Sequence, residues 1–447
     1  MNWEEEYRVK LVTADEAASG IRSGDTIFLG HSMMTPFALC QALARRKDEL
    51  ENVTIVHELN TRSLPWFQAG YEKAFHLVTF FGTKFDRHLI ADDRMDTICR
   101  DLGLMIRQFD EDRWPKGRYV YMRQLSPPDH HGYCSLGHMI WNDLDFIENF
   151  DLVLTEVNPG FIRTYGENYV HVSQISKFVE MDPSHQLSHE DVSKALGVVV
   201  KDENEAGIAE VICSFVATDL VRDGDVLQTG VGSISGAMYA FLHEKHDLGI
   251  HSEVLAGGIL DLVKEGVITG KTKNIKTGKV VATAITGLNE KEMEFIHMNP
   301  MFELHRTSYV NDPRVISQND RVVAINNALA VDLSGQIASD SLGPLMYSGA
   351  GGQFCFVMGA LLSRGGRSVT VLAATAKEGK VSRITPTLEK GQGVSVPRVI
   401  ADYVVTEYGI ASLFGKTMKQ RANELISIAH PDFRSELRAS ARKLGWL

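Results

Sequence analysis

Short apolar runs alternate with amphipathic stretches along most of this chain. Residues 26–30, 52–59, 76–82, 119–125 and 150–158 are mostly apolar and short enough to be buried strands. Segments with apolar residues at helical spacing separate several of these runs. Strands and helices that alternate in this way predict mostly parallel sheets covered by helices.

The stretch from residue 227 to residue 258 shows this organisation most clearly. A short apolar run ends in a glycine cluster at 230–236, which lets the backbone turn tightly and approach a ligand. Residues 238–242 have the apolar spacing of a helix, and a second strand then carries Glu253 at its end. Ligands of such units lie beyond the carboxyl ends of the strands, so Glu253 is a candidate for chemistry.

A sequence repeat links the two halves of the chain. Ile21–Gly30 (IRSGDTIFLG) matches Val221–Gly230 (VRDGDVLQTG), and each is followed by a predicted helix and a strand that ends in histidine and glutamate. Glu58 in the first half is therefore the counterpart of Glu253 in the second. We expect two similar open, mostly parallel α/β domains related by internal duplication.

The polar segment between residues 185 and 205 is typical of a domain junction. Placing the boundary within it predicts one domain at residues 1–195 and another at residues 196–447. The second of these domains carries Glu253. A chain of 447 residues is too long for one core, because domains usually have about 100–200 residues.

The composition is that of an ordinary globular protein, with 44% hydrophobic and 23% charged residues. The net charge of -11 argues against a nucleic acid or an anionic membrane as the main partner. No apolar run approaches the ~18 residues of a membrane span, and the start MNWEEEYRVK has no targeting pattern. The cysteines are widely spaced, which indicates neither a disulfide framework nor structural zinc. We therefore expect a cytoplasmic protein.

His185 and His189 are related by i and i+4, a spacing that can hold a metal on one helical face. No third ligand accompanies the pair in the sequence. We interpret the pair as part of a polar linker and expect no metal.

Two glycine-rich turns are candidate binding sites. The cluster at 230–236 reads G-x-G-x-x-x-G, one residue longer than the dinucleotide fingerprint, so an NAD-dependent oxidoreductase stays an alternative. The turn SGAGGQF, with Gly349, Gly351 and Gly352, presents backbone N–H groups that can donate to a phosphate or an oxyanion. A plain strand-to-helix turn would have the same local pattern.

Glu253 has two interpretations from its position alone. A carboxylate at the carboxyl edge of a sheet can act as a general base or as a covalent nucleophile. A strand-end glutamate is otherwise a solvated or ion-paired group.

Eight ordered segments resemble those of one enzyme family. In chain order they are SPPDHHGYCSLG, LTEVN, LQTGVG, IHSEV, SGAGGQF, SRITPTL, VVTEYGIASL and AHPDFR. They resemble the acetyl-CoA hydrolase/transferase group of family I CoA-transferases, and the likeness covers nearly the whole chain. The resemblance implies a two-domain open α/β fold and a ping-pong transfer of coenzyme A between carboxylic acids.

The resemblance also implies roles for individual residues. The family's catalytic glutamate falls on Glu253, its oxyanion-hole glycine on Gly352, and an asparagine beside the glutamate on Asn311. Val231 matches a residue near the acyl group. A desolvated Glu253 can attack a thioester carbonyl, and the backbone N–H groups of Gly351 and Gly352 can bind the oxyanion.

The implied substrates are an acyl-CoA and a small carboxylic acid, so coenzyme A enters as a substrate. The expected donor is acetyl-CoA or succinyl-CoA, and the expected acceptor belongs to the 4-hydroxybutyrate, butyrate or itaconate class. We also expect a homodimer or homotetramer. An acyl-CoA hydrolase that uses the same glutamate, and a non-catalytic acyl-CoA-binding protein, stay alternatives.

Two departures from the family pattern bear on specificity. Cys355 and Met358 replace charged residues that relatives commonly carry behind the glycine turn, and loss of that ion pair can change acceptor choice or weaken activity. The bulky Met33 and Met34 in the glycine turn of the first repeat suggest a reshaped acyl pocket. The candidate substrate-binding residues are Val231, Gly232, Met33, Met34, Glu58 and Gly349.

Overall fold

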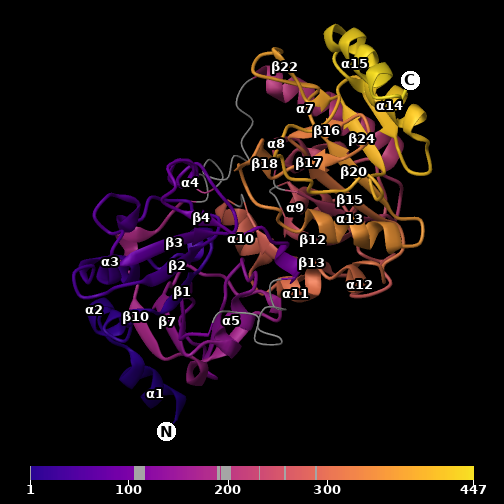
Figure 1. The fold of residues 1–447 in the computed structure, drawn as a ribbon. Coiled ribbons are helices and arrows are strands. Elements are labelled where there is room, and N and C mark those ends of the chain that lie inside the picture. Colours follow the sequence, from indigo (N-terminus) through magenta and orange to yellow (C-terminus); the bar gives the residue numbers. More distant parts are fainter. Residues whose placement is uncertain are drawn as a thin grey trace. The chain divides into compact units, whose positions relative to one another are not determined.

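The computed structural model describes residues 2–104, 116–188, 192, 203–230, 232–255, 258–286 and 289–447. The chain forms two compact units (Figure 1). Unit 1 comprises Met1–Leu196 and Thr283–Ser308, and unit 2 comprises Gly197–Ala282 and Tyr309–Leu447. The predicted division at residue 195 stays a prediction, and the structure adds that the segment 283–308 packs with unit 1.

One sheet lies in unit 1. Within the described residues it has seven strands, in the order β10 (Lys177–Glu180), β7 (Leu152–Val157), β5 (Tyr119–Leu125), β1 (Thr26–Leu29), β2 (Val53–His57), β3 (Phe75–Thr79) and β4 (Asp96–Thr97). Each neighbouring pair in this sheet is parallel. The carboxyl ends of all these strands therefore meet at one edge.

The second large sheet is also mostly parallel. In the described part of the chain it has nine strands, in the order β25 (Gly409–Ser412), β24 (Tyr403–Thr406), β20 (Arg367–Val371), β15 (Val322–Asn327), β11 (Val226–Thr229), β12 (Gly249–Leu255), β13 (Val280–Ile285), β14 (Phe302–Leu304) and β8 (Tyr165–Gly166). The run from β24 through β20, β15 and β11 to β12 is parallel, and β25 is an antiparallel edge strand. The prediction of an α/β protein with two mostly parallel sheets is confirmed.

The sequence repeat corresponds to a repeat of structure. β1 lies between β5 and β2, and β11 lies between β15 and β12, so both repeat strands occupy the same place in their sheets. The turns before them also match, because Asp25 accepts a hydrogen bond from the Arg22 N–H (2.8 Å) and Asp225 accepts one from the Arg222 N–H (2.6 Å). The two halves of the chain therefore place Glu58 and Glu253 at the carboxyl ends of equivalent strands, Glu58 directly after β2 and Glu253 near the end of β12.

Helices and small sheets complete both units. In the part of the chain that the structure describes, the α-helices are α1 (Trp3–Lys10), α2 (Ala14–Ala18), α3 (Phe37–Arg45), α4 (Arg87–Ala91), α5 (Asp143–Asn149), α7 (Glu203–Phe215), α8 (Ser233–Gly236), α9 (Ile259–Lys264), α10 (Glu290–Ile296), α11 (Thr307–Val310), α12 (Pro313–Ile316), α13 (Gln353–Leu362), α14 (Met418–Ile428) and α15 (Pro431–Lys443). The remaining strands are β6 (Tyr133–Ser135), β9 (Tyr169–His171), β16 (Ala330–Asp332), β17 (Ile337–Ala338), β18 (Ser341–Leu342), β19 (Leu345–Met346), β21 (Thr375–Ala376), β22 (Val381–Ser382) and β23 (Ile384–Thr385).

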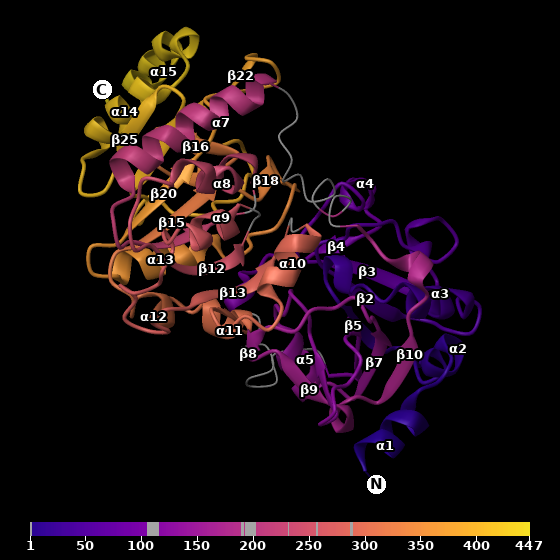
Figure 2. The same cartoon turned by 180° about the vertical axis from the view of Figure 1, so that it is seen from behind.

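In unit 2, α13 contacts β15 and β20, whereas α7 contacts β24 and β25. Figure 2 gives the view from behind, in which α7 is prominent. The C-terminal helix α14 packs against β24 and β25, and α15 packs against α14. An apolar cluster that includes Val404, Ala411, Leu425 and Leu437 contains residues of all four elements. Each fully buried aliphatic side chain of this kind stabilises the fold by about 1.5–3 kcal/mol.

The helix expected at residues 238–242 is the clearest difference from the sequence prediction. The structure has the single turn α8 at Ser233–Gly236 and a 3-10 helix at Met238–Phe241 instead of one continuous helix. Gly236 is a weak helix former, and the burial of Met238 and Tyr239 determines the path of the chain more strongly than helix propensity does. The strand that follows continues two residues past Glu253, to Leu255.

Among the described residues, none of the helices combines the length and the apolar character that crossing a membrane requires.

His57 is a titratable group inside the core of unit 1. It is the last residue of β2 and has no exposed surface, and its Nε2 accepts a hydrogen bond from the Trp66 indole N–H (3.2 Å). Burial lowers the pKa of His57 to about 3, so the folded protein keeps this imidazole neutral at physiological pH.

We expect the His57→Gln variant to lose less thermal stability on acidification than the unaltered protein. In the unfolded chain His57 has a pKa of about 6.5, so between that pH and pH 3 only the unfolded state takes up the proton. Stability is therefore lost as the pH falls, by about 2 kcal/mol between pH 8 and pH 5. Gln keeps an acceptor for Trp66 but does not titrate. Parallel curves of Tm against pH for the two proteins would contradict this assignment.

Candidate active site

Glu253 lies on β12 near the carboxyl end of the strand and is partly buried. Its Oε2 accepts a hydrogen bond from the Nδ2 of Asn311. Asn311 is fully buried and directly follows α11. One oxygen of the carboxylate is therefore held by a neutral amide, which orients the side chain without neutralising its charge.

His251 fixes the backbone that carries Asn311. It is fully buried, and its Nε2 lies 2.8 Å from the carbonyl oxygen of Val310. A carbonyl only accepts, so the proton of this hydrogen bond is on Nε2. His251 and Glu253 are two residues apart on one strand, so both side chains project from the same face. The sequence repeat singled out His251 but did not predict this role.

The glycine turn of SGAGGQF lies against the same carboxylate. A Cβ added at Gly352 would collide with Oε2 of Glu253 and with Nδ2 of Asn311. At Gly351, where φ is +57°, an added Cβ would lie 3.7 Å from Oε1 of Glu253. The backbone of the turn therefore approaches both carboxylate oxygens, and only glycine allows the approach at Gly352.

The turn also begins a helix. Gly352 is the N-cap of α13, and the partial positive charge of a helix N-terminus favours a nearby carboxylate. Gly349 lies earlier in the turn, where its carbonyl oxygen accepts a hydrogen bond from Ser348 Oγ (3.4 Å). Cys355 is buried in the first turns of α13 and Met358 is partly buried, at the positions where the sequence departs from the family pattern.

The glycines after β11 are packed against side chains from the end of β15. A Cβ at Gly232 would collide with the amide of Asn327, and a Cβ at Gly230 would lie 3.3 Å from Oδ1 of Asn326. Asparagine side chains of the protein itself thus occupy the space that these glycines leave. In a dinucleotide-binding fingerprint, a pyrophosphate lies against the glycines instead. Val231 lies outside the described residues.

In unit 1 the structure brings Glu58 next to the turn that contains Met33 and Met34. Glu58 follows β2, and its Oε2 lies 2.5 Å from Nε2 of His31. His31 directly precedes the 3-10 helix Ser32–Met34, in which both methionines are buried. The candidate residues of the first half therefore form one cluster at the carboxyl edge of their sheet.

The LTEVN motif holds this turn from the other side, a role that the sequence did not predict. Glu156 on β7 accepts a hydrogen bond from the Leu39 N–H (2.7 Å) in the first turn of α3. Gln124 on β5 donates to the carbonyl oxygen of Thr35 (3.0 Å) and accepts from Asn158 (2.8 Å). Burial raises the pKa of Glu156 to about 7. The available signal was a pair of adjacent polar residues near the end of each otherwise apolar strand.

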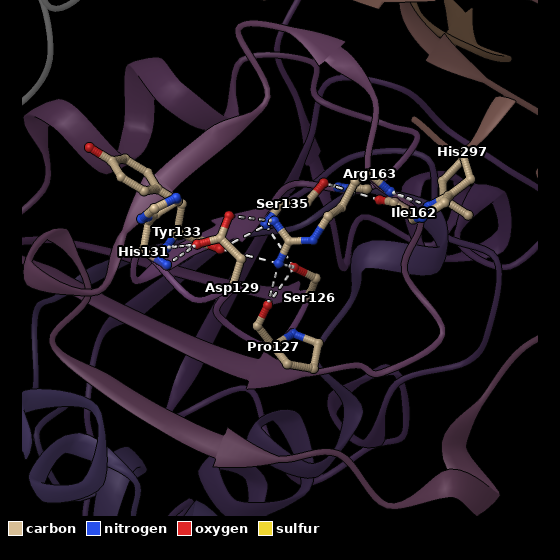
Figure 3. A network of polar contacts seen from close by, with 10 residues as sticks. Ser126, Pro127, Asp129, His131, Tyr133, Ser135, Ile162, Arg163 and His297 are labelled. Carbon is tan, nitrogen blue, oxygen red and sulfur yellow. Dashed lines mark hydrogen bonds and ion pairs between the residues drawn. The ribbon is translucent and has the colours of Figure 1, made fainter. Parts of the chain in front are cut away.

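The SPPDHHGYCSLG loop is ordered by an arginine (Figure 3). Arg163 donates to the carbonyl oxygen of Pro127 (2.8 Å) and forms an ion pair with Asp129 (3.3 Å). The backbone N–H of Arg163 donates to Nδ1 of His297 (3.1 Å). These contacts give the loop a structural role in unit 1.

Within the described residues, no group of three or more His, Cys, Asp or Glu side chains is arranged to hold a metal ion. His185 ends the 3-10 helix Pro183–His185, and His189 lies outside the described residues.

Two family profiles match the chain. The profile described as Acetyl-CoA hydrolase/transferase N-terminal domain matches residues 1–83, and the profile described as Acetyl-CoA hydrolase/transferase C-terminal domain matches residues 289–441. The second match contains Asn311 and the glycine turn.

Curated relatives extend over nearly the whole chain. The 4-hydroxybutyrate coenzyme A transferase of Clostridium kluyveri is 40% identical over 451 residues, which cover 99% of this chain and 100% of the relative. The butyryl-CoA:acetate CoA-transferase of Anaerostipes caccae is 34% identical, with coverage of 99% and 98%.

A solved structure agrees with the fold. The crystal structure of RipA from Yersinia pestis matches with a TM-score of 0.89 and 32% identity, and the match covers 100% of both chains. The profiles, the relatives and the fold thus agree with one another. The chain belongs to the acetyl-CoA hydrolase/transferase family and is a CoA-transferase family enzyme.

Proposed function

We propose that this protein is an acyl-CoA:carboxylate CoA-transferase with Glu253 as its nucleophile. The observation that carries the proposal is the arrangement around Glu253, whose carboxylate lies between the amide of Asn311 and the backbone of Gly351 and Gly352. Asn311 donates to Oε2, and the backbone of the turn approaches Oε2 at Gly352 and Oε1 at Gly351. A nucleophile beside backbone N–H donors is the arrangement that acyl transfer requires.

In the first step, Glu253 attacks the carbonyl carbon of the acyl-CoA. The N–H groups of Gly351 and Gly352 stabilise the oxyanion, with the help of the N-terminus of α13. When the tetrahedral intermediate collapses, the carbon–sulfur bond breaks and the CoA thiolate leaves. Glu253 is then part of a mixed anhydride with the acyl group.

In the second step, the CoA thiolate attacks the glutamyl carbonyl of the anhydride. The bond to the acyl group breaks, the first acid leaves as a carboxylate, and Glu253 carries CoA as a thioester. A second carboxylic acid reverses both steps and leaves as its CoA ester. Neither step consumes water, so an enzyme of this kind must exclude water from the intermediates.

We propose acetyl-CoA or succinyl-CoA as the donor, and an acid of the 4-hydroxybutyrate, butyrate or itaconate class as the acceptor. The names of two relatives, a 4-hydroxybutyrate coenzyme A transferase and a butyryl-CoA:acetate CoA-transferase, support four-carbon acids. We assign substrate contacts to residues of both halves of the chain. They are Val231, Gly232, Gly349, Met33, Met34 and Glu58.

The domain organisation and the oligomeric state are also part of what we propose for this protein. We propose two domains, at residues 1–195 and 196–447, of which the second carries Glu253. We further propose that the enzyme is a homodimer or homotetramer, which light scattering of the purified protein would measure.

Replacing Glu253 by Gln should reduce CoA exchange at least about a thousandfold, because the nucleophile is lost. Borohydride treatment of the unaltered protein incubated with acetyl-CoA should reduce the glutamyl-CoA thioester, and mass spectrometry should place the change on Glu253. The control is Glu265→Gln, which removes a half-exposed carboxylate paired with His243 and should leave exchange unchanged. Full exchange by the Glu253→Gln variant would overturn the proposed function.

Replacing Gly352 by Ala should lower kcat about a hundredfold or more, because the new Cβ would displace Glu253 and Asn311 and disturb the oxyanion donors. The matched control is Gly207→Ala on α7, since a Cβ there meets nothing within 4 Å. The control should keep its activity and gain helix stability of about 0.5–1 kcal/mol. Equal activity of the two variants would rule out the proposed contact.

Free CoA release separates transfer from hydrolysis by the same glutamate. With acetyl-CoA alone, a transferase should consume about one equivalent per subunit and then stop, since only an acid can discharge the thioester. Adding a carboxylic acid should restart consumption without releasing free CoA, as a thiol reagent would measure. Continuous release of free CoA without an acid would identify a hydrolase instead.

A further inference from the structure

His251 lies in unit 2 where the three segments around Glu253 meet. It has no exposed surface and is on β12, two residues before Glu253. Its Nε2 donates to the carbonyl oxygen of Val310 (2.8 Å). The centroid of its ring lies 6.4 Å from that of Phe356 on α13, at an interplanar angle of 61°. One side chain of β12 therefore contacts both the segment that carries Asn311 and the helix that follows the glycine turn.

The amide of Asn311 depends on its own backbone for its position. Its Nδ2 donates to Oε2 of Glu253. Its Oδ1 is buried and has no hydrogen-bond partner among the residues that the structure describes. Since no second hydrogen bond in this part of the protein holds the amide, a shift of the backbone at Asn311 moves the amide away from Glu253.

That backbone is anchored on both sides of Asn311. After it, Asp312 is the N-cap of α12, and its carboxylate accepts a hydrogen bond from the Arg314 N–H (2.8 Å). Before it, the buried carbonyl of Val310 accepts the hydrogen bond from His251. Because His251 and Glu253 lie on the same strand, the second anchor sets the position of Asn311 relative to the carboxylate.

The ring of His251 extends the same connection to α13. Phe356 is buried and belongs to an apolar cluster that also contains Val310 and Ile316. The Phe356 N–H donates to the carbonyl oxygen of Gly352 (3.0 Å), the residue that approaches Glu253 most closely. The first turn of α13 therefore packs against the imidazole as well as against this cluster.

The first repeat indicates that packing alone does not require a histidine here. The equivalent residues of β1 and β11 pair with Thr54 on β2 and with Gly249 on β12. Two residues further along each strand, Val56 is therefore the counterpart of His251. A buried polar group costs stability unless it is hydrogen-bonded, so a valine would fill such a position at lower cost. The contact that distinguishes His251 is its hydrogen bond to Val310.

We propose that His251 is a positioning residue for acyl transfer, whose Nε2 N–H holds the Val310 carbonyl and thereby keeps the amide of Asn311 on the Glu253 carboxylate. This inference rests on the proposed function, in which Glu253 is the nucleophile. His251 is fully buried, so it acts through Asn311 and not on the substrate. All of these residues belong to unit 2. Loss of the N–H therefore slows the attack by Glu253 and leaves the binding of the CoA ester unchanged.

The test separates the N–H of His251 from its ring. Gln can place an amide N–H where Nε2 lies but has no ring, whereas Phe keeps a ring beside Phe356 but has no donor. We expect His251→Phe to lower kcat about tenfold or more, with the KM for acetyl-CoA changed less than about twofold. His251→Gln should restore kcat to within about threefold of the unaltered protein. If His251→Phe does not fold, His251→Asn replaces it, since the shorter amide reaches only the position of Nδ1.

A second comparison uses the Asn311→Ala background, which lacks the amide that His251 positions. There His251→Phe should lower kcat less than about twofold further, because the two residues act as one unit. The matched control is Ser363→Ala. Ser363 is buried at the opposite end of α13 and donates to the carbonyl oxygen of Asn319 (2.6 Å). This control should lower Tm and leave kcat unchanged.

In each variant kcat is expressed per subunit that borohydride traps on Glu253, so that inactive protein does not contribute. A purely structural role of His251 would lower Tm but leave this kcat unchanged. Equal kcat values for His251→Phe and His251→Gln, or the same loss with and without the amide of Asn311, would overturn the inference. Failure of the trap in the unaltered protein would instead overturn the proposed function itself.

Discussion

The close contact between the Glu253 carboxylate and the backbone at Gly352 constrains the structure of the candidate active site in unit 2. The approach leaves no space for a Cβ at Gly352, and the amide of Asn311 occupies the remaining side of the carboxylate. Three segments far apart in the chain must therefore meet, which are the end of β12, the residue after α11 and the first turn of α13. His251 contributes to this meeting by holding the carbonyl of Val310. The parallel sheet brings these three segments together, because β12, β11 and β15 all end at the edge where α13 begins.

Much of the fold follows from local pattern. The strand expected at residues 119–125 is β5, and the strands expected at residues 52–59 and 150–158 contain β2 and β7. These elements could be predicted because an apolar run acts within a few positions of the chain. The helix expected at residues 238–242 is instead a 3-10 helix at Met238–Phe241, in which Met238 and Tyr239 are buried.

The candidate site was less accessible to sequence reasoning. Glu253 followed from its place after a glycine turn, but Asn311 came only from the family resemblance, since nothing near residue 311 indicates a contact with residue 253. The ion pair between Arg123 and Asp143 could not be predicted at all. Its members lie on different elements, β5 and α5. Contacts of this kind depend on how the strands are ordered in the sheet, which periodicity does not encode.

The two halves of the chain treat equivalent carboxylates in opposite ways. Glu253 is partly exposed, and its carboxylate lies between the neutral amide of Asn311 and the backbone of Gly351 and Gly352. Glu58 is buried, and its Oε2 lies 2.5 Å from Nε2 of the neutral imidazole of His31, so its carboxylate has a defined direction. After an internal duplication, each copy of the turn can specialise, because the sheet preserves the position of the carboxylate while its neighbours change. The immediate neighbours of the two glutamates, rather than their places in the fold, therefore make their surroundings different.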